Sequence, residues 1–148
     1  MVIVRGIERG EVAAAVEIIN EGTLAPGAEH PERGDEYWAA VEDVRSRRGD
    51  VLVALEGGVV LGVCQVIIFR HFQHTGGWCA ELESVYVRSD RRGQRIGAAL
   101  LDTAENLARA AGCYRVQLTS RNVRRDAHRF YLTHGYEQSS QGFRRALD

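Results

Sequence analysis

The chain has 148 residues, of which 45% are hydrophobic and 26% are charged. This composition excludes a chain that stays disordered, and the length predicts a single domain over residues 1–148 with its own hydrophobic core. No apolar run reaches the roughly 20 residues that cross a bilayer. Five charges within the first 20 residues exclude a signal peptide, so we expect a cytoplasmic protein that does not bind membranes.

Charge is distributed unevenly along the chain. Residues 1–87 contain 14 acidic residues and 7 arginines, a net charge of −7, whereas residues 88–148 contain 12 arginines and 6 acidic residues, a net charge of +6. We therefore expect the C-terminal part to bind an anion. There is no lysine, so the basic side chains are guanidinium groups suited to planar contacts with phosphate, although a GC-rich genome explains this absence equally well.

The spacing of apolar residues predicts the secondary structure. In chain order we expect a strand over 1–7, a helix over 9–20, a loop over 22–34, a helix over 35–47, and strands over 51–55 and 59–69 joined by a tight turn. A polar segment over 70–77 then precedes a strand over 78–87, a turn over 90–97, a helix over 96–111, a strand over 114–119, a helix over 124–134 and a final hairpin within 136–146. The second half alternates strands and helices, which indicates an α/β (α+β) fold with a mixed sheet.

Three cysteines, Cys64, Cys79 and Cys113, are too far apart for a Cys-x-x-Cys motif. Their odd number is typical of a reducing compartment. We interpret them as small buried apolar side chains.

The most informative segment is the glycine-bearing turn that follows the strand over 78–87 and begins the next helix. Backbone N–H groups and the positive end of the helix dipole point into such a turn, and glycine lets a phosphate approach closely. The turn is not a Walker loop, because it lacks Gly-Lys-Ser/Thr. On these grounds alone, a pyrophosphate site and a purely structural turn are equally probable.

This turn resembles the acetyl-CoA motif of the GNAT superfamily of N-acetyltransferases, Gln/Arg-x-x-Gly-x-Gly/Ala, with Arg92 in the first place and Gly97 in the last. The chain departs from the motif at Arg95, where the family usually has glycine. Because the start of a helix does not require glycine, we expect the Arg95 side chain to point outward and the site to be retained.

A second segment, from Asn122 through Phe130-Tyr131 to Gly135-Tyr136, is similar to the family's Asn, Ala, Phe-Tyr, Gly-Phe/Tyr pattern. The two matches together cover residues 81–146. They imply a single-domain GNAT fold, a mixed central sheet of six to seven strands flanked by about four helices, and acetyl-CoA as the co-substrate. The stretch from Asp126 to Leu132 further resembles aminoalkylphosphonate N-acetyltransferases, but also bacterial members whose substrates are unknown.

The resemblance implies a set of cofactor-binding residues. The strand before the turn would pair with the pantetheine arm as an added strand does. The set comprises Val85, Tyr86, Val87, Arg92, Gly93, Gln94, Arg95, Ile96, Gly97, Asn122 and Arg124.

Transfer of an acetyl group to an amine needs a base for the amine proton and a proton donor for the departing thiolate. Tyr131 matches the family's general acid, and the alternative is an aromatic that only packs beside Phe130. Glu81 and Glu83 share a face of their strand by its period of two, unless a bulge separates them. Either is a candidate base, directly or through water, and a solvated strand face is the alternative.

His71 and His74, in the segment before that strand, are candidate substrate contacts. His-x-x-His without a third ligand is a poor metal signal, so we predict no metal. The arginines near residues 121–129 fit a solvated helix face and the 3′-phosphate of CoA. No aromatic platform supports nucleic acid binding.

We therefore predict an acetyl-CoA-dependent N-acetyltransferase for a small-molecule primary amine, such as an aminoalkylphosphonate, acting as a homodimer. The alternatives are acetylation of a peptide or protein N-terminus, and a catalytically inactive CoA-binding module.

Overall fold

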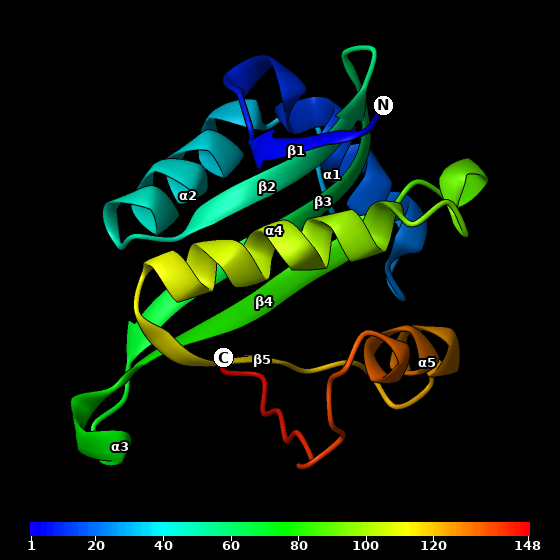
Figure 1. Ribbon diagram of the computed structural model, residues 1–148. Coiled ribbons are helices and arrows are strands. Elements are labelled where there is room, and N and C mark those ends of the chain that lie inside the picture. Colours follow the sequence, from blue (N-terminus) through cyan, green and yellow to red (C-terminus); the bar gives the residue numbers. More distant parts are fainter. The chain divides into compact units, whose positions relative to one another are not determined.

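The computed structural model describes all 148 residues of the chain. The chain divides into two compact units, Met1–Gln117 and Leu118–Asp148 (Figure 1). The first unit contains the sheet with the helices that cover it, and the second contains one helix and the C-terminal segment.

The sheet has five strands in the order β1-β2-β3-β4-β5. The strands are β1 (Ile3–Gly6), β2 (Asp50–Glu56), β3 (Val59–Arg70), β4 (Trp78–Val87) and β5 (Cys113–Leu118). Neighbouring strands from β1 to β4 pair antiparallel. A helix connects β4 to β5, and this crossover sets β5 parallel to β4 (Figure 1). The expected mixed sheet is confirmed.

The helices of the first unit cover both faces of the sheet. They are α1 (Val12–Gly22), α2 (Gly34–Ser46), the short α3 (Gln73–Gly76) and α4 (Ile96–Ala110), with 3₁₀ turns η1 (Arg9–Glu11) and η2 (Ser89–Arg91). Figure 1 shows α4 in front of the sheet and α1 with α2 behind it. No helix has both the length and the apolar character needed to cross a membrane.

Burial explains why these elements form where they do. Helix α1 buries Val12, Val16 and Ile18 in a cluster with Val53 of β2 and Val63 of β3. On the other face, α4 buries apolar residues three or four positions apart, as an amphipathic helix does. These residues are Ile96, Leu100, Leu101, Ala104 and Ala108.

The turn between β2 and β3 follows directly from its two glycines. Gly57 and Gly58 both have positive φ, at 57° and 79°, and they lie between the paired residues Glu56 and Val59. Positive φ at both central residues is what a two-residue hairpin needs to match the twist of its strands. The tight connection expected from the sequence is confirmed.

The cysteines follow the expectation in part. Cys64 and Cys79 are buried, whereas Cys113 is only partly so, and all three are free thiols. Burial raises the pKa of the Cys64 thiol to about 12, which keeps it protonated and unreactive.

The second unit holds α5 (Arg125–Thr133). Its end is marked by Gly135, which has a φ of 96°. Residues 136–148 form neither helix nor strand, so the expected final hairpin is wrong and the sheet has five strands rather than six to seven. The segment is mostly polar, and its Phe143 is 92% exposed, so it lacks the apolar face that a hairpin needs.

Candidate functional site

Strand β4 contains a bulge at Ser84 and Val85. Glu83 pairs with Gln65 of β3 and Tyr86 pairs with Val63, so two residues of β4 oppose the single Cys64 between them. Ser84 has a φ of 53°, which few residues other than glycine adopt. Bulges of this kind re-aim side chains and interrupt pairing, and they occur often beside active sites.

The bulge lies after the two glutamates and does not separate them. Glu81 pairs with Ile67 and Glu83 with Gln65, so both point to one face of the sheet. Glu81 is half-buried and Glu83 is exposed as a whole residue. Partial burial of the carboxyl group, and then the negative charge of Glu81, raise the pKa of Glu83. The pair is thus electrostatically coupled.

Glu81 has a partner on the neighbouring strand. Nε2 of Gln117, on β5, donates a hydrogen bond to Oε1 of Glu81 at 2.8 Å. The Oε1 atom of the same amide lies 3.7 Å from the sulfur of Cys79. This contact was not predictable from the sequence, because the register of β5 against β4 cannot be read from spacing.

The turn from Arg92 to Gly97 follows β4 and η2 and leads into α4. Gly93 has a φ of 79°. The amide of Ala99 donates to the carbonyl of Arg95 at 3.1 Å, which is the first hydrogen bond of the helix. The amides of Ile96, Gly97 and Ala98 therefore lie in the first turn, where a helix offers no internal acceptor. Such a helix start attracts anions.

Arg95 differs from the expectation in its backbone. It lies at φ 64° and ψ 17°, in the left-handed region, immediately before α4. The expectation that the start of this helix does not require glycine is therefore wrong at Arg95. The side chain is exposed, in agreement with the expectation that it points outward. The chain thus keeps the backbone of the turn with a residue that is less suited to it than glycine.

We expect Arg95→Gly to raise the free energy of unfolding by about 1 kcal/mol. A residue with a side chain pays roughly 1–2 kcal/mol in this region, and the greater freedom of glycine in the unfolded chain offsets part of that gain. Urea denaturation measures the change. Arg95→Ala is the matched control, because it removes the guanidinium but keeps the strained Cβ. Equal stability of the two variants would show that the left-handed backbone carries no cost.

Side chains hold the turn to its surroundings. Nη2 of Arg91 donates to both carboxylate oxygens of Glu56 at 3.2 Å, and its Nε donates to Oε1 of Gln94 at 2.6 Å. Nε of Arg92 points to the carbonyl of Val87 at 3.4 Å. The turn is therefore tied both to the β2–β3 hairpin and to the end of β4.

The end of α1 also contacts this region. Oε1 of Glu21 accepts a hydrogen bond from the amide of Ser89 at 2.6 Å. A Cβ atom at Gly22 would lie 2.6 Å from Cδ1 of Tyr86, so only glycine allows α1 to approach β4 this closely. The loop over 23–33 thus starts from a point fixed against the candidate site.

His71 and His74 lie at the other end of β4 from the turn. The Tyr114 hydroxyl is 2.5 Å from Nδ1 of His71, and the ring centroids of His74 and Tyr114 are 4.7 Å apart. His71 follows Arg70, which pairs with Trp78 at the start of β4. Within the first unit, the two histidines therefore do not lie beside the turn from Arg92 to Gly97.

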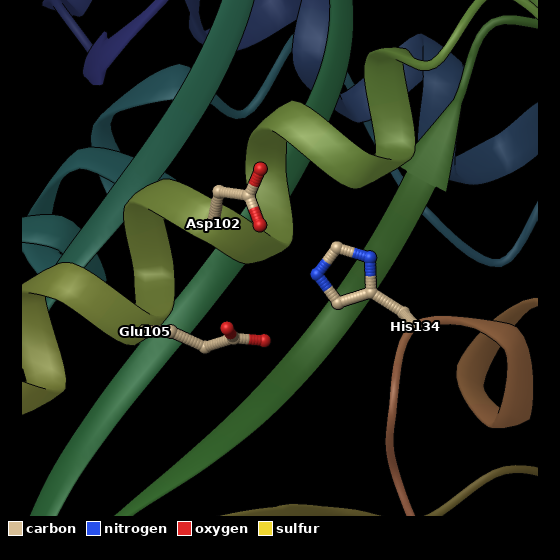
Figure 2. Close-up of side chains that lie close together, drawn as sticks. All are labelled: Asp102, Glu105 and His134. Atoms are coloured by element: carbon tan, nitrogen blue, oxygen red, sulfur yellow. The ribbon is translucent and has the colours of Figure 1, made fainter.

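Helix α4 carries two acidic side chains, Asp102 and Glu105, which project on the same side of the helix (Figure 2). Asp102 is exposed and Glu105 is half-buried. They follow the turn by five residues or more, so they lie outside the first turn of α4, where the helix dipole acts on an anion.

The remaining predicted residues lie in the second unit. Asn122 is exposed in the turn before α5, and Arg124 is the residue that caps the helix. Tyr131 is half-buried on α5, with its ring centroid 5.3 Å from that of Phe130 and 6.0 Å from that of Tyr136. These aromatic neighbours pack against the ring of Tyr131.

Comparison with known proteins identifies the family. Residues 13–136 match the model of the acetyltransferase (GNAT) family. The chain therefore belongs to this family, as the turn and the second motif indicated.

Two curated relatives are both named as N-acetyltransferases. The chain is 42% identical over 95 residues to an aminoalkylphosphonate N-acetyltransferase of Salmonella typhimurium, over 64% of this chain and 61% of the relative. It is 27% identical over 103 residues to a probable glucosamine 6-phosphate N-acetyltransferase of Drosophila melanogaster, over 70% of this chain and 41% of the relative. The chain thus spans less than two thirds of the length of either relative.

A solved structure has the same fold over nearly the whole length. A transcriptional regulator from Bacillus halodurans C-125 aligns with a TM-score of 0.91 at 29% identity, covering 99% of this chain and 100% of that one.

Proposed function

We propose that the chain is an N-acetyltransferase that moves the acetyl group of acetyl-CoA to the primary amine of a small molecule. The observation that carries the proposal is the bulged strand β4, which bears two carboxylates and continues into an anion-attracting turn at the start of α4. Family membership supports acetyl-CoA as the donor.

The cofactor would bind along β4 and at the turn. The amides of Gly93 to Gly97 and the helix dipole favour the pyrophosphate. Ser84 and Val85 oppose a single residue of β3, so the ladder is locally disrupted and backbone groups near Val85 and Val87 are suited to pair with the pantetheine arm. Asn122 and Arg124, with Tyr86, complete the predicted set of contacts.

The chemistry needs one base and one acid. The amine nitrogen attacks the acetyl carbonyl carbon, and its proton passes to Glu81 or Glu83, directly or through water. The carbon–sulfur bond then breaks, and the Tyr131 hydroxyl gives its proton to the departing CoA thiolate. The coupled carboxylates also attract the amine in its cationic form, as the net charge of −7 over residues 1–87 favours.

The acceptor we propose is an aminoalkylphosphonate or a similar zwitterion. The two relatives are named for acceptors that combine an amine with a phosphorus oxyacid. The amine of such a molecule suits the acidic face of β4, and its phosphonate suits a guanidinium. His71 and His74 remain proposed substrate contacts. Because they lie at the other end of β4 from the turn, the acidic face of β4 is the favoured place for the acceptor amine.

We also propose a domain organisation, an oligomeric state and a cellular location for the whole chain. We include both units in one acetyltransferase domain over 1–148, because the family match covers residues from each. We propose a homodimer in the cytoplasm that requires no metal and binds neither nucleic acid nor membranes. The free thiols favour a reducing compartment. Sedimentation tests the dimer, and an unchanged rate with a chelator is expected if no metal takes part.

Incubation with labelled acetyl-CoA and a panel of amines tests the activity. The panel contains an aminoalkylphosphonate, the same alkylamine without the phosphonate, glucosamine 6-phosphate, and a peptide with a free N-terminus. We expect label on the aminoalkylphosphonate and much less on its matched alkylamine. Label on the peptide alone would favour N-terminal acetylation. Acetyl-CoA binding without transfer to any amine would favour an inactive CoA-binding module.

A further inference from the structure

We propose that Gln117 is a positioning residue, which acts on the acceptor amine through Glu81 and is itself held by Cys79. The inference deepens the proposed function and rests on it. Gln117 is on β5, whereas Glu81 and Cys79 are on β4, so the contact crosses between the two strands.

The hydrogen bonds determine which way the amide faces. An ionised carboxylate only accepts, so the NH₂ group of Gln117 must point to Oε1 of Glu81, at 2.8 Å. The amide oxygen is then directed to the Cys79 sulfur, at 3.7 Å, and this sulfur also lies 3.7 Å from the carbonyl oxygen of Ala80. The reverse orientation would place a carbonyl oxygen against a carboxylate. The fully buried Cys79 is thus compatible with the orientation that Glu81 requires.

The effect on Glu81 is to fix a side chain that would otherwise rotate. The amide of Gln117 holds Oε1 of Glu81. The other carboxylate oxygen, Oε2, takes no part in this hydrogen bond. A group fixed before the substrate arrives loses no rotamer freedom during the reaction. Gln117 therefore orients Glu81 toward the acceptor without touching the acceptor itself.

Few other charges act on this pair of carboxylates. Glu83 responds to the charge of Glu81. The facing residues of β3, Gln65 and Ile67, are uncharged. Helix α1, which also packs against β4, carries Glu17 and Glu21, and the carboxylate of Glu21 is bound to the amide of Ser89. The hydrogen bond from Gln117 is therefore the direct polar contact that orients Glu81.

The test compares the full chain with Gln117→Leu and Gln117→Asn. Leucine keeps much of the volume but cannot donate, and asparagine is one methylene too short to reach both partners. We expect each variant to lower kcat/KM for the amine about 10-fold, since a misplacement of 1 Å costs up to about 10²-fold. The affinity for acetyl-CoA should not change.

Two further measurements separate this inference from the proposed function. Carbon-13 NMR of the side-chain carboxyl groups requires no activity, and the Glu81 signal should change position in Gln117→Leu, because its carboxylate loses the donor at 2.8 Å. In a Glu81→Gln background, Gln117→Leu should cause no further loss of kcat/KM. An unchanged Glu81 signal, or an undiminished effect in that background, would overturn the role of Gln117. A wild-type chain that transfers acetyl to no amine would instead overturn the proposed function.

Discussion

Tyr131→Phe is expected to lower kcat by about 10²-fold, within the range for loss of a positioned proton donor. The affinity for acetyl-CoA should stay the same. The ring of Tyr131 lies among the rings of Phe130 and Tyr136, and phenylalanine keeps this packing while it removes only the hydroxyl. The departing thiolate would then have to take its proton from water. Steady-state and single-turnover kinetics measure kcat and the affinity for acetyl-CoA.

Tyr136→Phe is the matched control, because it removes a hydroxyl from the neighbouring ring and should leave kcat close to that of the wild type. Thermal unfolding of both variants checks that the second unit keeps its structure. If Tyr131→Phe has the wild-type kcat where chemistry limits turnover, Tyr131 is a packing residue.

Gly97→Asp is expected to weaken acetyl-CoA binding by about 100-fold or more. Gly97 is the second residue of α4, where an added carboxylate would meet the pyrophosphate. Like charges placed together in a binding site cost several kcal/mol, and each 1.4 kcal/mol is a factor of ten in affinity. Titration calorimetry measures the loss. The variant should fold, because an acidic side chain in the first turn of a helix is favourable.

Gly97→Asn separates charge from bulk, since asparagine has nearly the same shape without the charge. We expect its affinity to lie between those of the wild type and Gly97→Asp. The turn is not the anion site if folded Gly97→Asp binds acetyl-CoA as tightly as the wild type does.

Much of the fold was predictable because the local patterns are strong. The mostly apolar run over Trp78–Val87 and the apolar spacing of α4 gave boundaries that agree with the structure to within a residue. The face shared by Glu81 and Glu83 also followed from the period of a strand. These predictions depend only on neighbours in the chain, which is why they succeed.

Other features depend on contacts that spacing does not encode. The bulge occurs at Ser84, a residue with no preference for positive φ, and the pairing of Gln117 with Glu81 depends on strand register. The left-handed backbone of Arg95 could have been inferred, since the family's glycine at that place was a signal for it. The expected C-terminal hairpin is wrong because it was placed on apolar spacing after Tyr136, and the mostly polar residues there form no strand.

The close approach of Gly22 to Tyr86 has a consequence for how the chain tolerates change. Helix α1 ends at a fixed point against β4, so changes in the length or sequence of the loop over 23–33 need not move the turn from Arg92 to Gly97. Surface loops tolerate insertions at little cost in free energy. The loop can therefore vary while the turn keeps its geometry, and Gly22 marks the boundary between the two.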